Sequence, residues 1–426
     1  MTTAAQAPLQ PRKSTGAPRS RAAARPRSPG ARVGPLPVVN LVALELGLGL
    51  ALFAKHTTVC WPVLLIAVTL ALGRWRGHWL VRWAQLIAGY LVRSHNRSVT
   101  SPEPVAADSP PRLTVGSDDR RLALLRLLLP ELNIAHSTDH QRESLGLAWH
   151  HGAWSAVLEV QATASMITPV GGSLSVPFGA LVGCLEHRGV VLEAIQVISH
   201  CYSGSAALPS SSPALRSYLE VLGPLPAAAR RTTWVVVRLD PRRCPRAVAE
   251  RGGGVLGCHR ALIGALSRVR SALDSRGMST RPLDADQLLR AGISAAELSP
   301  AAGAGGPVAL SEGWRAVTAA GVGHTSYVIS GWGAPGAAPN LTALTSVRVL
   351  STTVALSLSC DESPGAEGAE VGLRGLVRVS ARSPGELETA EPRLQAVSRR
   401  LGVLLSPLHG RQITGLAATL PLGAPT

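Results

Sequence analysis

The 426 residues are too many for one small domain and enough for a membrane anchor followed by one large or two ordinary domains. The mean hydropathy is +0.20 and the formal net charge is +16. Of that charge, +12 lies in the first 97 residues, beside long apolar runs. This placement is typical of a membrane orientation signal and argues against a nucleic-acid-binding protein.

Two transmembrane helices are predicted within residues 35–97. Residues 37–54 are interrupted only by Asn40 and Glu45, and residues 57–73 contain no charge. Each run is close to the roughly 20 residues that cross a bilayer core. A signal peptide is the competing interpretation, but the basic lead-in and the second apolar run disfavour it. Only Lys55 lies between the runs, so the positive-inside rule places both termini in the cytoplasm of a two-pass protein.

The first apolar run carries a ridge of small residues, Ala43, Gly47 and Ala51, which recur every four positions. Such a ridge lets another helix approach closely in a membrane. Glu45 points about 200° away from Ala43 on a helix. That acid either faces a further protein neighbour or sits near one leaflet and reaches toward water.

A helix rich in Trp and Arg is predicted directly after the second run. Its sequence, "RWRGHWLVRWAQLIAGYLVRSHNR", places aromatic and apolar side chains on one side at helical spacing. Trp and Tyr favour the membrane interface, where arginines reach lipid headgroups. The predicted interface residues are Arg74, Trp75, Arg76, Trp79, Arg82, Trp83 and Tyr90.

The remaining chain divides by composition. Residues 1–34 read as a disordered basic tail, and residues 98–117, rich in Pro and Ser, as a linker. Residues 118–426 are predicted to form a cytoplasmic α+β domain, because strand-like and helix-like stretches both alternate and cluster there. Five of the six cysteines fall in this part without a paired framework, as a reducing compartment requires.

Several elements of this domain are predicted individually. A hairpin turns at His151-Gly152, and "TTWVVVRL" is the clearest buried strand. "AWSAV" at 153 and "GWRAV" at 313 hint at two similar halves. The predicted helices cover 177–186, 257–275, 284–290 and 386–401. The predicted strands cover 145–150, 153–160, 190–199, 232–239, three segments between 313 and 381, and a last hairpin centred on His409-Gly410.

Two stretches resemble ligand motifs. "GGGVLG", residues 252–257, fits the dinucleotide pattern, but the preceding strand ends about a dozen residues too early for the tight turn this fold needs. Its simpler interpretation is a flexible lead-in to a helix, whose free N–H groups would at most hold an anion. Asp284 and Asp286 resemble the metal-nucleotide motif of some sugar transferases, yet Asp284 and Gln287 also have capping-box spacing.

Catalytic and metal chemistry finds little support elsewhere. The chain has no C-x-x-C, H-E-x-x-H or G-x-S-x-G pattern, which disfavours zinc and a nucleophile elbow. No lysine follows Lys55, so the cytoplasmic part has no Walker A, Schiff-base or kinase-type lysine. Energy for any driven process therefore has to come from another subunit.

The domain order and several strings resemble one family. A basic tail, two close spans and the Trp/Arg helix precede "WSAVLEV", "LEAIQVISH", "RTTWVVVRLDPRRCPRAVAERGGG", "RPLDADQLLRA" and "LHGRQITGLAATLPLG". Over most of residues 35–426 they are similar to EccE, a membrane component of the actinobacterial type VII secretion system, in its streptomycete-like form.

This resemblance implies a plasma-membrane complex with EccB, EccD and the ATPase EccC, in which the chain is a peripheral, non-catalytic scaffold without a cofactor. It implies no catalytic residue and no nucleic-acid partner. The alternative is a membrane-anchored glycosyl or nucleotidyl transferase that uses Asp284 and Asp286.

Overall fold

The computed structural model describes residues 32–33, 36–53, 57–75, 78–99, 119–161, 176–202, 230–304, 306–333, 341–347, 349–361 and 370–424. The predicted basic tail up to residue 31, residues 100–118 of the predicted linker region and Arg76 lie outside these ranges.

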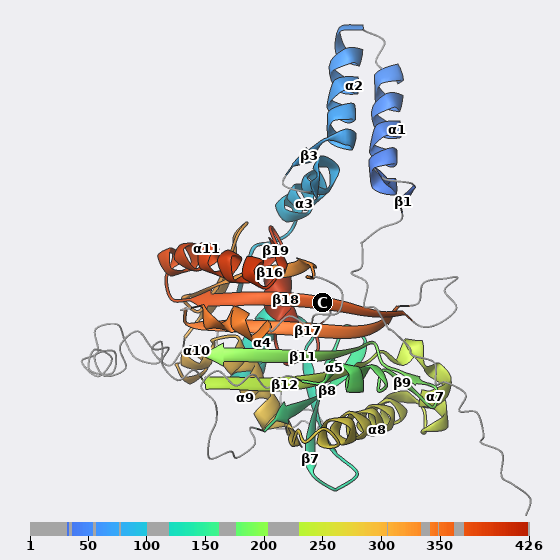
Figure 1. Ribbon diagram of the computed structural model, residues 1–426, viewed down its shortest axis with the longest axis vertical. Coiled ribbons are helices and arrows are strands. Elements are labelled where there is room, and N and C mark those ends of the chain that lie inside the picture. Colours follow the sequence, from blue (N-terminus) through green and yellow to red (C-terminus); the bar gives the residue numbers. More distant parts are fainter. Residues whose placement is uncertain are drawn as a thin grey trace, which may run out of the picture.

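A helical hairpin stands away from the main body of the molecule (Figure 1). It consists of α1 (Val38–Phe53) and α2 (Thr57–Leu72), and a third helix, α3 (Leu80–Val92), lies between the hairpin and the body. Among the described residues, no helix is both long and apolar enough to cross a membrane. Short strand pairs flank these helices: β1 (Arg32–Val33) with β2 (Leu36–Pro37), and β3 (Arg74–Trp75) with β4 (His78–Trp79).

One large antiparallel sheet forms the body, which agrees with the predicted α+β class. Its strand order is β5-β14-β15-β16-β18-β17-β11-β12-β8-β7-β6, with β13 added beside β8 and β19 beside β16. The strands are β5 (Asn96–Val99), β6 (Asn133–Thr138), β7 (Ser144–His150), β8 (Ala153–Val160), β11 (Ala194–Tyr202), β12 (Arg230–Leu239), β13 (Thr280–Pro282), β14 (Val308–Glu312), β15 (Val317–Ala319), β16 (Val322–Gly331), β17 (Ser351–Asp361), β18 (Glu370–Ala381) and β19 (Leu404–Pro407).

Helices cover both faces of this sheet, because the central strands are apolar on both sides. Val235 and Val237 of β12 face α8, whereas Trp234 and Val236 face the opposite helices. The helices on the first face are α8 (Gly254–Asp274) and α11 (Pro384–Arg400), and those on the second are α4 (Arg120–Leu128), α9 (Ala285–Ala295) and α12 (Gln412–Ala418). The short helices are α5 (Phe178–Val182), α7 (Pro245–Glu250) and α10 (Ser299–Gly303), with 3₁₀ turns at Pro241–Arg243 and Leu341–Ser346.

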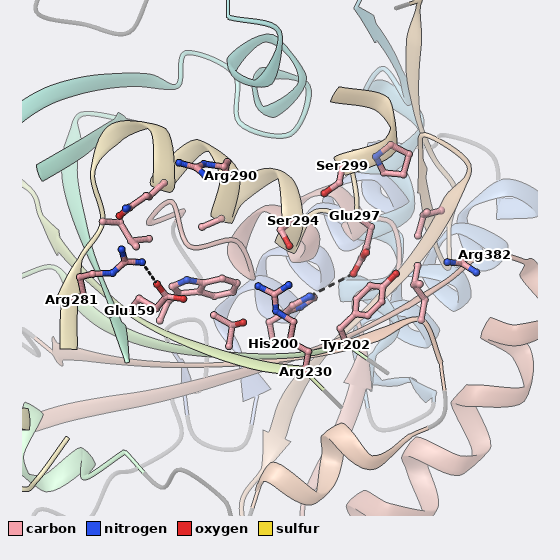
Figure 2. A pocket seen from close by; sticks show the side chains of 18 residues that line it. Glu159, His200, Tyr202, Arg230, Arg281, Arg290, Ser294, Glu297, Ser299 and Arg382 are labelled. Atoms are coloured by element: carbon pink, nitrogen blue, oxygen red, sulfur yellow. Dashed lines mark hydrogen bonds and ion pairs between the residues drawn. The ribbon is translucent and has the colours of Figure 1, made fainter. Parts of the chain in front are cut away.

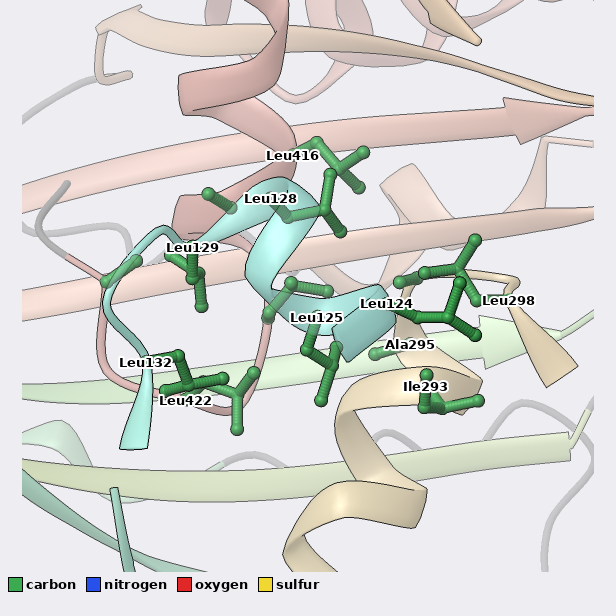
Figure 3. Close-up of a cluster of buried hydrophobic side chains, with 14 of the residues drawn as sticks. Leu124, Leu125, Leu128, Leu129, Leu132, Ile293, Ala295, Leu298, Leu416 and Leu422 are labelled. Carbon is green, nitrogen blue, oxygen red and sulfur yellow. The ribbon is translucent and has the colours of Figure 1, made fainter. Parts of the chain in front are cut away.

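The apolar core of the second face joins segments from the two ends of the chain. Leu124, Leu125 and Leu128 of α4 pack with Ile293 of α9 and Leu416 of α12 (Figure 3). All five side chains are buried. Burial of each such side chain contributes roughly 1.5–3 kcal/mol, so this contact ties the first helix of the body to the last.

The body consists of two halves with the same order of elements. In the first half, β6-β7-β8 is followed by β11, β12, α8, β13 and α9; in the second, β14-β15-β16 is followed by β17, β18, α11, β19 and α12. Their strand orders mirror each other across the β11–β17 pair at the centre of the sheet. The two similar halves are therefore present. The two similar pentapeptides do not occupy equivalent positions, because "AWSAV" lies in β8, whereas "GWRAV" runs into β15, whose counterpart in the first half is β7.

Several predicted elements need correction. The helix predicted over 177–186 is only the five residues of α5, after which β9 (Glu186–His187) and β10 (Val190–Val191) make a small hairpin, and the strand predicted from 190 is interrupted before β11. The hairpin predicted at His409-Gly410 is wrong. The N–H groups of Leu408 and Gly410 instead donate to carbonyls of distant residues, Ser326 and Trp314, and α12 follows.

The first residues of the predicted linker lie in the sheet. Ser98 and Val99 belong to β5, which pairs with β14 in the second half. The segment that leaves the helical hairpin is thus an edge strand of the body.

Candidate functional site

The hairpin is held by a close approach at Gly47. Gly47 is buried, and a Cβ added there would overlap Cβ of Ala67 on α2. The amide of Asn40 donates to the Ala71 carbonyl at 2.7 Å, which satisfies this buried polar group. Glu45 is exposed, Ala43 is half-buried, and the side chain of Ala51 lies outside the described residues.

An aromatic cluster fastens α3 to the body. The Trp83 ring lies 6.2 Å from Trp314 and 5.6 Å from His409, and Tyr90 meets Trp314 edge-on at 5.3 Å. Trp314 and His409 stack with an angle of 3° between their rings. Aromatic pairs at such separations contribute roughly 0.5–1.5 kcal/mol each beyond the area they bury, so the cluster fixes the direction in which α3 leaves the body.

A buried carboxylate completes this attachment. Nη2 of Arg93, directly after α3, lies 3.1 Å from Oε2 of Glu312, whose side chain is fully buried. The same nitrogen donates to the Gly410 carbonyl at 2.6 Å. The other oxygen of Glu312 accepts from the N–H of Ile413 at 2.8 Å, in the first turn of α12. We call Trp83, Tyr90, Arg93, Glu312, Trp314 and His409 the joint.

The joint changes the interpretation of the predicted interface residues. Trp83 and Tyr90 contact protein, because the body presents two rings to that side of α3. Arg74 lies over the Trp79 ring at 5.1 Å, and Arg82 is exposed. The side chain of Trp75 lies outside the described residues. The exposed apolar residues of α3 are Ile87, Leu91 and Val92.

The aspartates of the transferase alternative have structural partners. Asp284 caps α9: its carboxylate accepts from the Gln287 N–H at 2.7 Å, and the Gln287 side chain accepts from the Asp284 N–H at 3.3 Å. Asp286 pairs with Arg121 at 2.6 Å and with Arg290, and these hydrogen bonds lower its pKa. Capping-box and surface pairing therefore account for both carboxylates.

The glycine-rich stretch at residues 252–257 also has a local structural explanation. Gly252, Gly253 and Gly254 have positive φ and follow α7, a helix and not a strand, so a dinucleotide turn is absent at this place. No group of three or more potential metal ligands occurs among the described residues.

A pocket of about 520 Å³ lies between the sheet and the end of α9. Figure 2 shows His200, Tyr202 and Arg230 on the strand side, facing Ser294 and Glu297 on the helical side. Arg281, which pairs with Glu159 at 2.8 Å, lies at one end, and Arg382 lies at the other. The lining includes four arginines and two glutamates and is therefore net positive.

A buried polar chain forms the floor of the pocket. Nε2 of His200 lies 3.6 Å from Oε1 of Glu297, and Nδ1 shares a 2.9 Å hydrogen bond with Oγ1 of Thr353. Fully buried Arg378 donates to Thr353 at 2.9 Å and to the Ala295 carbonyl at the end of α9. Burial and the charge of Arg378 lower the pKa of His200 to about 3, whereas burial raises the pKa of Glu297. His200 is thus neutral at physiological pH.

Sequence reasoning identified neither the joint nor the pocket. Glu312, Trp314 and Glu297 come from segments that give no motif, and their partners lie far away in the chain. The one local signal for the pocket was Glu297, because it stands just beyond the end of a helix at a position where glycine is preferred.

Comparison with known proteins identifies relatives of this chain. Residues 227–329, which include most of the pocket, match the family described as "Putative type VII ESX secretion system translocon, EccE". The ESX-5 secretion system protein EccE5 of Mycobacterium marinum is 26% identical over 310 residues, which are 67% of this chain and 68% of that protein. Over these residues the chain is similar to EccE proteins of type VII secretion systems.

A second relative matches a shorter segment at higher identity. The ESX-1 secretion system protein EccE1 of Mycolicibacterium smegmatis is 39% identical over 97 residues, 23% of this chain and 20% of that protein. Both relatives are named as proteins of ESX secretion systems.

Proposed function

We propose that this chain is a non-catalytic structural subunit of the type VII secretion membrane complex and a scaffold for ATPase-driven export across the plasma membrane. The observation that carries this proposal is the joint, which rigidly connects an exposed apolar hairpin to a large folded body. The chain is similar to EccE proteins and has no lysine after Lys55 for ATP-driven or Schiff-base chemistry. A hairpin fixed to a folded body therefore suits a structural subunit that positions other subunits.

The hairpin is the proposed membrane element. Its outward surface is apolar: Leu50 is 65% exposed, Trp61 71% and Leu65 69%. A soluble protein rarely exposes so large an apolar surface without a partner or a bilayer to cover it. Each helix has 16 residues and is about 24 Å long, so a two-pass arrangement requires local thinning of the bilayer.

We place both termini in the cytoplasm, with the body beneath the membrane. Arg74 and Arg82 then lie close to headgroups of the inner leaflet. The exposed apolar residues of α3 continue this lipid-facing surface. Glu45 is left for a protein neighbour within the membrane, on the side of α1 that faces away from the ridge of Ala43, Gly47 and Ala51.

The partners proposed are the other membrane components EccB and EccD, the ATPase EccC, and membrane lipids, in a hetero-oligomer that excludes nucleic acid. The ATPase supplies the energy, and this chain supplies fixed geometry between the membrane and the cytoplasmic parts.

Gentle detergent extraction of the tagged chain from its own host, followed by native-mass separation and mass spectrometry, tests this function. We expect the chain to travel in a complex on the order of a megadalton with an ATPase and a polytopic membrane protein. Migration as a monomer or dimer would contradict the proposal. A Glu45→Leu variant tests the intramembrane contact: unchanged co-purification would remove that role from Glu45.

A further inference from the structure

Glu297 occupies a backbone position that normally suits glycine. It follows the end of α9, with φ of 58°, in the left-handed region. The N–H of Leu298 donates to the Ile293 carbonyl at 2.9 Å, and the N–H of Glu297 donates to the Ser294 carbonyl at 3.1 Å. These two bonds define a Schellman motif, in which the left-handed residue is usually glycine because a Cβ is unfavourable there.

The side chain of Glu297 adds a second unfavourable feature. It is 8% exposed, and its Oε1 accepts no hydrogen bond among the described residues. Burial of a carboxyl is costly, and the Ser351 hydroxyl and the charge of Arg378 offset only part of that cost, because burial still raises its pKa. His200, 3.6 Å from Oε1, is neutral at physiological pH. Strained and unsatisfied residues that persist in a fold cluster at functional sites. Oε1 is covered by protein and faces Nε2 of His200, and the rest of the side chain lines the pocket beside it.

The rest of the pocket lining favours a negatively charged ligand group. Arg230 is exposed on the strand side of the pocket, and its guanidinium forms no hydrogen bond or ion pair with another described side chain. Arg382 lies at one end, and the hydroxyls of Tyr202, Ser294 and Ser299 also line the space. A guanidinium group recognises a phosphate or carboxylate through paired N–H donors.

We propose that this pocket binds a small hydroxylated organic oxyanion, a phosphate or a carboxylate, with its anionic group at Arg230 and a ligand hydroxyl at Glu297. The volume of about 520 Å³ is that of a small-molecule site. The second half of the body has no counterpart of Glu297, because the residue after the C-cap of α12 is Leu420, which is apolar and does not have positive φ. The site is therefore a specialisation of the first half.

Isothermal titration of the full-length chain in detergent tests the proposal, with ribose 5-phosphate, citrate and inorganic phosphate as probes at constant ionic strength. We expect saturable binding of ribose 5-phosphate or of citrate that Arg230→Gln weakens at least tenfold. The probe that binds distinguishes a phosphate from a carboxylate ligand. Exposed Arg276, at the end of α8 and outside the pocket lining, provides the matched control: Arg276→Gln should leave binding unchanged.

Glu297→Gly separates a ligand role from a structural one. Glycine relieves both the left-handed backbone and the buried carboxyl, so we expect a higher Tm together with at least tenfold weaker binding of the hydroxylated probe. Binding of inorganic phosphate, which has no alcohol group, should change little. Absence of binding by all three probes would overturn the proposal. A lower Tm of Glu297→Gly, with unchanged binding, would assign Glu297 to the fold and would also overturn it.

Discussion

Arg93 and Glu312 lie 219 positions apart in the sequence and form an ion pair of 3.1 Å in which the carboxylate is fully buried. Arg93 follows the helix that leads to the hairpin, and Glu312 ends β14 and also accepts from the N–H of Ile413 in α12. A single carboxylate thus connects the hairpin, an edge of the sheet and the last helix.

The first prediction concerns this carboxylate. Glu312→Ala leaves the Ile413 N–H without its acceptor, and Arg93→Met leaves the buried carboxylate without its cation, so each should lower the free energy of unfolding by about 2 kcal/mol. Because both changes break one interaction, the double variant should lose clearly less than the sum. Chemical unfolding of the chain in detergent measures all three. Strict additivity would show that the pair contributes no coupling.

The second prediction concerns the packing of α1 on α2. Gly47→Val places a side chain into Ala67 and should destabilise the hairpin by roughly 1–3 kcal/mol. Gly49 has no atom within 4 Å of an added Cβ, so Gly49→Val is the matched control. Protease sensitivity of the hairpin in detergent should rise for the first variant only. Equal sensitivity of both variants would contradict the close approach at Gly47.

The third prediction is loss of stability in mild acid. Burial lowers the pKa of His200 to about 3 and that of His324 well below 6.5, so the folded chain does not take up the protons that the unfolded chain binds. Their stabilising effect is complete above about pH 6.5 and is lost as the pH falls toward 3, at up to about 1.4 kcal/mol per pH unit for each histidine. The raised pKa of Glu297 opposes this effect.

Thermal unfolding between pH 7.5 and pH 4.5 measures that loss. His324→Gln removes one titrating group and should flatten the dependence of Tm on pH. His140→Gln, at an exposed position, should leave the slope as it is. An unchanged slope in His324→Gln would mean that this residue takes up its proton over the same pH range in the folded and the unfolded chain.

The fourth prediction separates the two aspartates of α9. Asp284→Ala removes a helix cap and should cost about 1 kcal/mol of stability. Asp286→Ala removes ion pairs of a half-exposed side chain and should cost less than about 1 kcal/mol. Unfolding of the two variants by denaturant compares them directly. A larger loss for Asp286 would mean that its pairing with Arg121 matters more to the fold than the cap.

Short-range patterns determined much of the local structure. The alternation around His151-Gly152 predicts the β7–β8 hairpin, whose two turn residues both have positive φ. The capping-box spacing of Asp284 and Gln287 predicts the start of α9, and the apolar runs predict α1 and α2. Each of these signals lies within one turn, one strand or one helix, so the interacting groups are already neighbours in the chain.

The tertiary structure alone decided which surfaces meet. Periodicity indicates that one side of α3 is apolar, but it does not distinguish lipid from the rings of Trp314 and His409, which come from more than 200 residues away. The correspondence of the two halves likewise rests on strand order and not on repeated residues. Glu297 and His200 approach only because α9 ends above β11. The apolar pattern of a sequence predicts that a side chain is buried. Which residue it contacts depends on how distant segments of the chain pack together.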